Sequence, residues 1–418
     1  MNNTLTFTGL FFLLISSNLS FAGGPLVLEG AKGNTPVRYQ NPNITIHAES
    51  GALGALSNNQ ADDLMRQAFD LWNNTSTATV NLTLDDTQII EDINLGNFDT
   101  YLPDVSGTLL NGDDGLNPIA YDNNGAIIDA FFGAKQSDST VGFAASIFNV
   151  KGDVFLEGYA VINGKQLNPP LTSTEFKLLI AHEIGHLIGL DHSQVNIDNR
   201  ETDFGTPFIC STASLDKYPV MYPFVCRGQE TLHADDISAV SALYPAANFD
   251  SNFGSIEGFF VDANGKAILG ANLWAENTVT GEVVSGTSDY LAQGNGAYKL
   301  NITPGTYTLH ANAINPLFNG GSSIGPYASD LSDRSFVTPN PITEVTLQSA
   351  VTSGDEIITV SASQKLAINL SSTGNDVVLN NSSGGGSSAL SHVTLLLLAG
   401  LMLTARRYGS RQLFIIHR

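Results

Sequence analysis

The stretch that decides the fold of this chain is His182-Glu183-Ile184-Gly185-His186-Leu187-Ile188-Gly189-Leu190-Asp191-His192. Two histidines four residues apart lie on one face of a helix, so the rings of His182 and His186 can reach a single metal ion. Gly189 lets the chain leave the helix through a turn that returns His192 as a third nitrogen ligand. Three neutral imidazoles with a fourth position open to water are typical of a catalytic zinc site.

Glu183 lies one step round the same helix, where its carboxylate can contact a water molecule at the open position without binding the metal. A carboxylate placed in this way is a candidate general base. The alternative is a core helix whose histidines make ordinary hydrogen bonds. We favour the metal site because three of the chain's 8 histidines fall between positions 182 and 192.

The pattern H-E-x-x-H-x-x-G-x-x-H resembles the signature of the metzincin metalloproteases, and its details are most similar to the matrixin branch. Ser193 follows the third histidine, as in matrixins. Residues 218–223, Tyr-Pro-Val-Met-Tyr-Pro, resemble the methionine turn, which makes Met221 a structural residue beneath the zinc. Residues 232–245 resemble the last helix of the catalytic domain. The resemblance implies a zinc-dependent endopeptidase that binds peptide substrates, with one zinc ion and Glu183 as the catalytic base.

The resemblance also covers residues 111–132. Two acidic, glycine-rich loops, 111–115 and 122–125, occupy the place where matrixins bind calcium. The oxygen ligands that calcium prefers would come from Asp113, Asp114, Asp122 and Asn124. Ordinary Asp-Gly and Asn-Gly turns explain these residues equally well. The resemblance further implies an edge strand on which a peptide substrate lies as an added strand; its residues would be Ala126, Ile127, Ile128, Asp129 and Ala130.

Composition argues against a nucleic-acid partner. The 418 residues include 18 Lys and Arg against 40 Asp and Glu, which gives a formal net charge of −22. Without a basic surface to neutralise phosphates, we expect no binding to nucleic acid. The simplest explanation of the charge is solubility. The length is sufficient for two or three domains.

We predict an α+β architecture with two folded parts. Residues 36–247 are expected to form the metzincin-like domain, in which a twisted mixed β-sheet packs with three helices. Residues 254–350 carry short strand patterns separated by glycine turns, which is typical of an all-β sandwich. Runs at 258–262 and 305–309 resemble the carboxypeptidase-regulatory-like modules. Such a part could be a spacer, a stabilising module or a substrate-binding module.

Both ends of the chain carry patterns typical of export. Residues 1–22 resemble a secretory signal peptide ending in Ser-Phe-Ala, which leaves a short N-terminal segment at 23–35. Residues 351–388 are predicted as a strand-poor linker that becomes Ser/Gly-rich. Residues 389–418 combine an apolar run with a basic end and resemble the GlyGly sorting tails of Gram-negative bacteria. A rhomboid-type protease removes such tails; a plain membrane anchor is the alternative. We expect an exported protein at the cell surface or in the medium.

Two cysteines, Cys210 and Cys226, flank the methionine turn. In an exported protein such a pair suggests a disulfide, which would stabilise the fold by roughly 3 kcal/mol on the chain-entropy model. Two buried free thiols are the alternative.

A second function competes with the peptidase. The chain could be a surface binding or adhesion protein whose zinc site is non-catalytic. The intact Glu183 favours the peptidase, because a non-catalytic site has no need of a base. An assay of proteolysis distinguishes the two.

Overall fold

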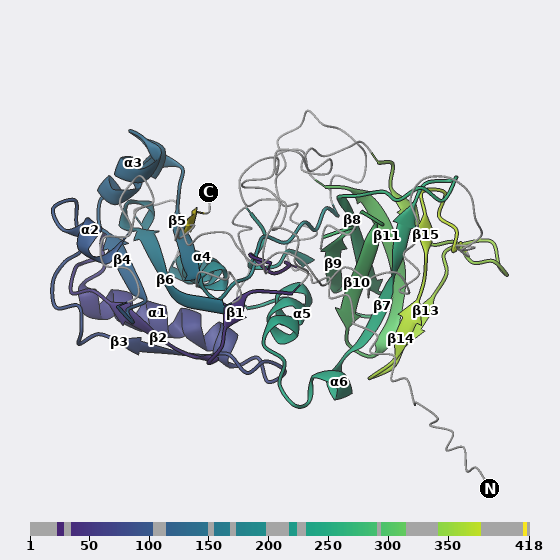
Figure 1. Ribbon diagram of the computed structural model, residues 1–418, viewed down its shortest axis with the longest axis horizontal. Helices are drawn as coiled ribbons and strands as arrows, with labels where there is room; N and C mark the ends of the chain where they lie inside the picture. Colours follow the sequence, from purple (N-terminus) through teal and green to yellow (C-terminus); the bar gives the residue numbers. More distant parts are fainter. Residues whose placement is uncertain are drawn as a thin grey trace, which may run out of the picture.

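The computed structural model describes residues 23–28, 35–102, 114–148, 154–167, 173–197, 217–223, 231–290, 294–314 and 342–377, and the backbone of 413–415. These residues form two parts that lie side by side (Figure 1). One part contains a mixed sheet with helices, and the other contains two β-sheets. Each part has its own buried hydrophobic cluster.

A seven-stranded sheet forms the base of the first part, with the order β16-β5-β6-β4-β2-β3 and with β1 paired to β6. Neighbouring strands along β3-β2-β4-β6 are parallel, whereas β5 is antiparallel to β6. The predicted mixed sheet is therefore confirmed. The strands are β1 (Arg38–Tyr39), β2 (Asn43–Ala48), β3 (Asn81–Asp85), β4 (Pro118–Asp122), β5 (Gly142–Phe148), β6 (Val154–Asn163) and β16 (Leu413–Ile415).

Three longer helices belong to the first part: α1 (Asn58–Asn73), α4 (Ser173–Leu187) and α5 (Ala234–Leu243). The start of α1 is fixed by Ser57, whose backbone N–H donates to the side chain of Gln60 (3.0 Å). The apolar stripe of α1 is buried and ends at Trp72, whose indole N–H donates to the carbonyl of Ala181 in α4 (2.9 Å). This bond joins α1 to the helix that carries the histidine motif. Shorter helical segments are α2 (Phe98–Tyr101), α3 (Ala126–Phe132), α6 (Phe249–Asn252), η1 (Gln136–Asp138) and η2 (Gly164–Leu167).

The predicted substrate edge strand is wrong, because residues 126–132 form the helix α3. Gly125 has φ of 81° and reverses the chain after β4, and the Asp122 carboxylate accepts a hydrogen bond from the backbone N–H of Ile128 (2.9 Å). Apolar residues at 127, 128, 131 and 132 recur with helical spacing, and Ile127 and Ile128 are buried against β5 and β6 residues. The prediction of a strand at Ala126, Ile127, Ile128, Asp129 and Ala130 is therefore wrong, because the apolar residues of this segment have the spacing of a helix and not the alternation of a strand. The antiparallel strand at this side of the sheet is β5.

Two β-sheets make up the second part and enclose a common buried cluster. One has the order β10-β7-β14 with β15 beside β7, and the other has the order β12-β11-β8-β9 with β13 beside β11. The predicted boundary at residue 350 lies too early, because β13, β14 and β15 belong to these sheets. The strands are β7 (Gly254–Val261), β8 (Ala271–Asn277), β9 (Val283–Thr287), β10 (Ala297–Ile302), β11 (Gly305–Ala313), β12 (Val345–Thr346), β13 (Ile358–Val360), β14 (Lys365–Ala367) and β15 (Leu370–Ser371).

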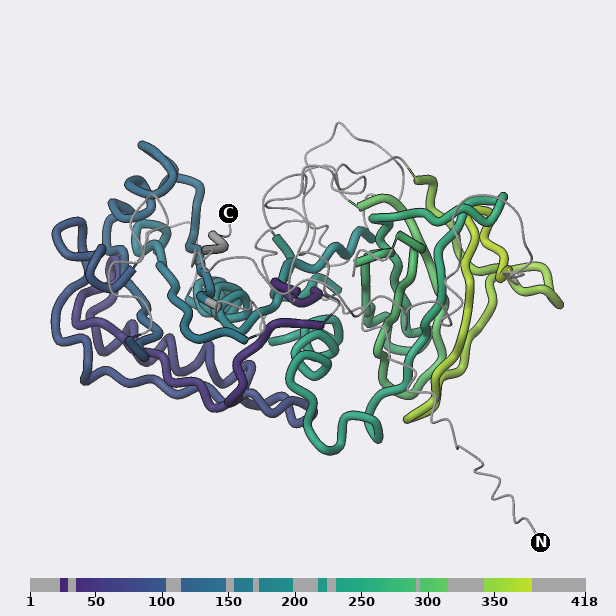
Figure 2. Tube along the Cα trace, viewed as in Figure 1, coloured from purple at the N-terminus to yellow at the C-terminus, as the bar shows by residue number. Residues whose placement is uncertain are grey.

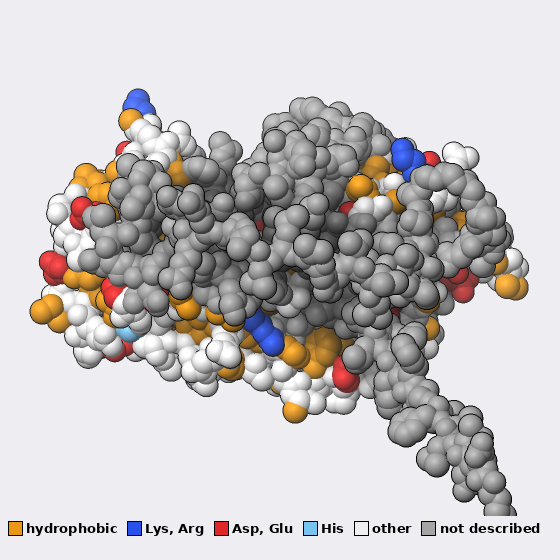
Figure 3. Space-filling model, in the orientation of Figure 1, with side chains coloured by type: hydrophobic (Ala, Val, Ile, Leu, Met, Phe, Trp, Pro, Cys, Tyr) orange, Lys and Arg blue, Asp and Glu red, His pale blue; other side chains and the backbone are white. Residues whose placement is uncertain are grey.

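The N-terminal segment 23–28 lies between the two parts, as the purple tube in Figure 2 shows. Its backbone pairs with the chain after α4, since Leu26 N–H donates to the carbonyl of Gly189 (2.8 Å). On the face drawn in Figure 3, the Lys and Arg side chains of the described residues lie singly and do not gather into a patch.

Some predictions fall on residues outside the described ranges. These are the signal peptide at 1–22, Asp113, Cys210, Cys226 and, apart from the backbone of 413–415, the tail at 389–418. Within the described ranges, no helix combines the length and the apolar character needed to cross a bilayer.

Candidate metal centre

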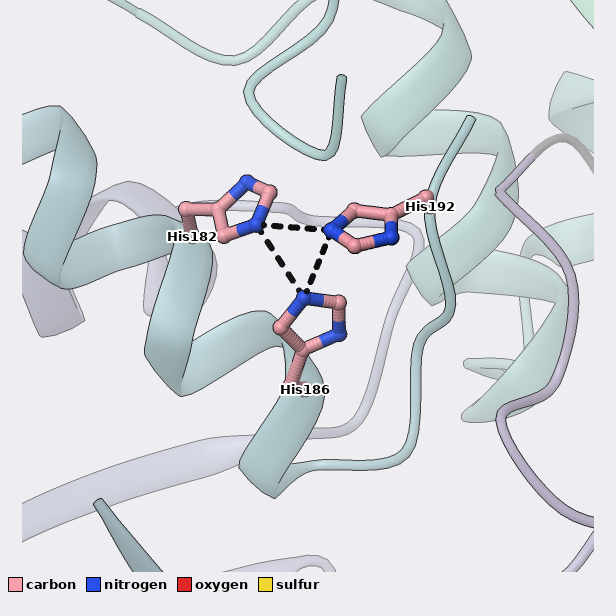
Figure 4. Close-up of side chains that lie close together, drawn as sticks. All are labelled: His182, His186 and His192. Carbon is pink, nitrogen blue, oxygen red and sulfur yellow. Dashed lines mark hydrogen bonds between the residues drawn. The ribbon is translucent and has the colours of Figure 1, made fainter. Parts of the chain in front are cut away.

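The three histidines of the motif converge on one point (Figure 4). The Nε2 atom of His182 lies 3.1 Å from Nε2 of His186 and 3.2 Å from Nε2 of His192, and the last two atoms are 3.2 Å apart. Zinc binds imidazole nitrogen at about 2.0–2.1 Å, so tetrahedral ligands lie about 3.3 Å from one another. The triangle therefore fits three ligands of a tetrahedral zinc ion. In the described part of the chain, no other group of three His, Cys, Asp or Glu side chains is placed to hold a metal.

Hydrogen bonds on the far side of two rings fix which nitrogen carries the proton. Nδ1 of His182 lies 2.7 Å from the carbonyl of Val220, and Nδ1 of His186 lies 2.8 Å from the carbonyl of Leu190. A carbonyl only accepts, so each Nδ1 carries the hydrogen and each Nε2 of a neutral ring presents a lone pair. Two lone pairs 3.1 Å apart repel each other unless a cation lies between them. The arrangement is thus that of metal ligands held by second partners.

The turn after α4 explains why glycine occupies position 189. Gly189 has φ of +99°, a conformation that residues with a side chain rarely adopt. A β-carbon there would also lie 2.6 Å from the ring of Phe155. Leu190 N–H then donates to the carbonyl of Gly185 (2.9 Å), which closes the turn and brings His192 to the other two histidines.

Met221 packs against Gly185 of α4, and its role as a methionine turn stays a prediction. A β-carbon at Gly185 would be 2.2 Å from its sulfur, and Met221 is buried. The Asp236 carboxylate of α5 fixes this turn by accepting hydrogen bonds from the backbone N–H groups of Val220 (2.8 Å) and Met221 (2.9 Å). The carbonyl of Met221 in turn accepts from Ser193 N–H (2.8 Å). Asp236 thereby positions the segments on both sides of the histidine triangle.

Glu183 is buried beside the first residue of β5. A β-carbon at Gly142 would lie 2.9 Å from Cγ of Glu183 and 3.0 Å from the carbonyl of Val161, so only glycine leaves room for the carboxylate. Burial raises the pKa of Glu183 to about 8. A metal cation beside Glu183 would lower this raised pKa. The carboxyl group could then take up and return a proton near neutral pH.

Gly142→Ala is expected to lower kcat for peptide hydrolysis by about 10- to 100-fold, because the new methyl group displaces the Glu183 carboxylate and such misplacement has costs of this size. Steady-state kinetics on a fluorogenic peptide measure the effect. The control is Gly96→Ala, where the nearest atom to a new β-carbon is an Asn94 side-chain oxygen 3.2 Å away. Unchanged kcat in Gly142→Ala contradicts the prediction.

Zinc should stay bound at an acidity that protonates ordinary histidines. Burial lowers the pKa of His182 to about 4, against a smaller raising effect of its bond to Val220, and burial lowers the pKa of His186 well below 6.5. Protons compete for the Nε2 lone pairs only near or below these pKa values. We expect zinc content to be unchanged between pH 7 and pH 5 and to fall as pH approaches 4, measured by elemental analysis after buffer exchange. Zinc loss with a midpoint near pH 6.5 in folded protein contradicts this.

The candidate calcium residues that the structure describes act as acceptors in turns. Asp114 Oδ1 accepts from Leu116 N–H (2.9 Å), and Asn124 Oδ1 accepts from Ala126 N–H (3.1 Å). Asp122 is buried and caps the start of α3. These contacts favour the alternative of ordinary turns at the three positions, and calcium binding stays a prediction.

Sequence reasoning missed Gly142 and the hydrogen bonds of Asp236. Gly142 begins a strand, where an isolated glycine indicates a close approach of another group. That signal identifies the position but not its neighbour, which lies far along the chain.

Comparison with known proteins agrees with the geometry. The matrixin family model matches residues 38–198, a range that runs from β1 to the loop after His192. It includes Glu183 and all three histidines, whereas Met221 and the second part lie outside it. A comparison with curated proteins gives no match. The family match and the three-histidine group together support a zinc metallopeptidase.

Proposed function

We propose that the chain is an exported zinc-dependent endopeptidase that hydrolyses peptide bonds in proteins outside the cell. The observation that carries the proposal is the convergence of the three Nε2 atoms of His182, His186 and His192 on one position. Zinc held there would supply a Lewis acid that polarises a peptide carbonyl and lowers the pKa of a water molecule.

The remaining roles, proton transfer and support of the metal site, belong to residues of the chain. Glu183 removes a proton from the attacking water and returns it to the leaving amine. Val220 and Leu190 hold two ligand rings in the tautomer that binds metal. Met221 is scaffold, since its sulfur lies under Gly185 on the inner side of the helix.

Substrate is proposed to lie along β5 rather than along residues 126–132. The strand β5 begins at Gly142, next to Glu183, so a peptide paired to it passes the candidate base. The outer side of β5 already pairs with the backbone of β16 in the antiparallel direction, at Ala145, Ser146 and Ile147. An extended peptide that replaces β16 can use the same main-chain donors and acceptors of β5.

The test is cleavage of denatured protein substrates by the purified chain, followed by mass spectrometry of the fragments. The proposal expects internal cuts in polypeptide that stop with a zinc chelator and return when zinc is added. A protein that binds zinc and cuts no polypeptide would instead be the non-catalytic surface binding protein. An enzyme that hydrolyses other amides, such as those of a cell wall, is a further alternative, and release of such fragments without polypeptide cleavage would overturn the proposal.

Export and tail processing are proposals from the sequence alone. We propose that residues 1–22 are removed on export and that residues 389–418 are a sorting tail cut by a rhomboid-type protease, or else a membrane anchor. Intact mass measurement of the protein from its native cells tests both. A mature mass that retains Met1 rejects the first proposal, and one that retains residues 389–418 rejects tail removal.

A further inference from the structure

The loop that carries His192 is buried although it has no regular secondary structure. Residues 191–197 are all buried, and they include the polar residues Asp191, Ser193, Gln194 and Asn196. Buried polar groups need hydrogen-bond partners, because an unsatisfied group costs about 1–3 kcal/mol. Several of those partners come from the second part of the molecule.

A chain of two hydrogen bonds joins the second part to the third zinc ligand. The hydroxyl of Tyr290, which follows β9, donates to Oδ2 of Asp191 (3.2 Å). Oδ1 of the same carboxylate accepts from the backbone N–H of His192 (2.7 Å). All three residues are at most 1% exposed. The Asp191 carboxylate thus links the orientation of the His192 backbone to Tyr290, 99 positions after Asp191 in the chain.

A second connection between the two parts involves Ser193, the residue after His192. The Ser193 hydroxyl donates to Oδ2 of Asp235 in α5 (2.5 Å) and lies 3.2 Å from the hydroxyl of Ser285 in β9. The backbone N–H of Ser285 donates to Oδ1 of Asp235 (2.5 Å). Asp235 therefore bridges the ligand loop and a strand of the second part.

A third connection closes the end of the loop. The side-chain amide of Asn196 donates to the carbonyl of Ala313 in β11 (2.8 Å), and the side-chain amide of Asn312 donates to the carbonyl of Asn196 (2.8 Å). This reciprocal pair holds the loop at Asn196, four residues after His192.

We infer that the second part of the molecule is a positioning module for the metal site, which holds the His192 loop through Tyr290, Ser285 and Asn312. The inference rests on the proposed zinc site. It assigns a role to the second part of the molecule, for which the sequence analysis left several roles open. The backbone of His182 and His186 belongs to α4, whereas the backbone of His192 lies on a loop, and several hydrogen-bond partners of that loop belong to the second part. Removing those partners lets the third ligand leave its place, which weakens zinc binding.

The experiment compares zinc affinity in the full-length chain and its Tyr290→Phe variant, by competition with a chromogenic chelator at neutral pH. Loss of a partner that orients a metal ligand weakens binding by about 10- to 100-fold, and we expect at least tenfold here. The control is Tyr298→Phe, which removes another buried hydroxyl of the second part, one that donates to the carbonyl of Ile368 (2.9 Å). It should lower thermal stability without changing zinc affinity.

A second variant separates this role from another contact of Tyr290, whose hydroxyl also lies 3.2 Å from the carbonyl of Pro25. Asn312→Ala removes the hydrogen bond to the carbonyl of Asn196 and should also weaken zinc binding, by about threefold or more, as expected for the loss of one neutral hydrogen bond. Cobalt(II) substituted for zinc should show an altered visible absorption spectrum in both variants and not in Tyr298→Phe.

The inference and the proposed function fail in different ways. Zinc affinity in Tyr290→Phe and Asn312→Ala within twofold of the parent, with unchanged cobalt spectra, overturns the positioning role even if the parent cleaves peptides. Weakened zinc binding in both variants supports the positioning role even if the parent cleaves no peptide. That second result would contradict only the proposed peptidase activity.

Discussion

Glu183→Gln should lower kcat for peptide hydrolysis by roughly 10³-fold while zinc content stays at one ion per molecule. The glutamine side chain has the size of glutamate but cannot take a proton from water. None of the hydrogen bonds that orient His182 and His186 involves Glu183, so the metal should remain bound. The measurement pairs steady-state kinetics with elemental analysis of the same protein sample.

The control for this change is Glu175→Gln, which makes the same substitution near the start of the same helix. Because Glu175 lies two turns before the motif, its variant should keep nearly full kcat. A Glu183→Gln protein with wild-type activity removes the general base from the proposal. A Glu183→Gln protein that has lost its zinc shows instead that the carboxylate supports the metal site.

Sequence alone was sufficient to predict that the three histidines of the motif converge, because their geometry is local. The spacing of His182 and His186 is one helical turn, and Gly189 marks the only kind of residue that its turn accepts. Three imidazoles within one short stretch leave few arrangements, and the structure has the one that was predicted.

The helix at 126–132 was not predicted, because the edge strand expected there came from the family resemblance and not from the spacing of the apolar residues. What decides it is Gly125 and the carboxylate of Asp122, which together start α3. The strand β5 is defined by pairing with β6 and by the contact of Gly142 with Glu183, 41 positions away. No local pattern contains that contact.

The connection between the two parts was also beyond local reasoning. Tyr290 and Asp191 are far apart in the sequence, and neither belongs to a recognisable motif that pairs them. The same holds for the short strands β13, β14 and β15, which are defined by their pairing with β11 and β7 and not by a local sequence pattern. Both features depend on pairing between residues that are far apart in the sequence. For this reason they were not predicted, and weak strand propensity is not the cause.

Removing one ligand has the other large expected effect, and His186→Ala is the sharpest case because this ring is buried and its Nε2 lies within 3.2 Å of both partners. Structural zinc sites bind with roughly 10–16 kcal/mol, which shared among their four protein ligands is about 2.5–4 kcal/mol each. The variant should therefore bind zinc at least about 10²-fold more weakly and lose peptidase activity at micromolar zinc.

The matched control for the ligand is His310→Ala, since His310 stacks on Trp274 in the second part and takes no part in the triangle. It should keep one zinc ion and its activity, with some loss of thermal stability from the stacked ring. If His186→Ala retained one tightly bound zinc ion, the metal would have to lie elsewhere, and the repulsion between the lone pairs of His182 and His186 would need another explanation. If instead zinc and activity disappear together in His186→Ala but activity alone disappears in Glu183→Gln, binding and proton transfer belong to different side chains of one helix, as the proposed mechanism requires.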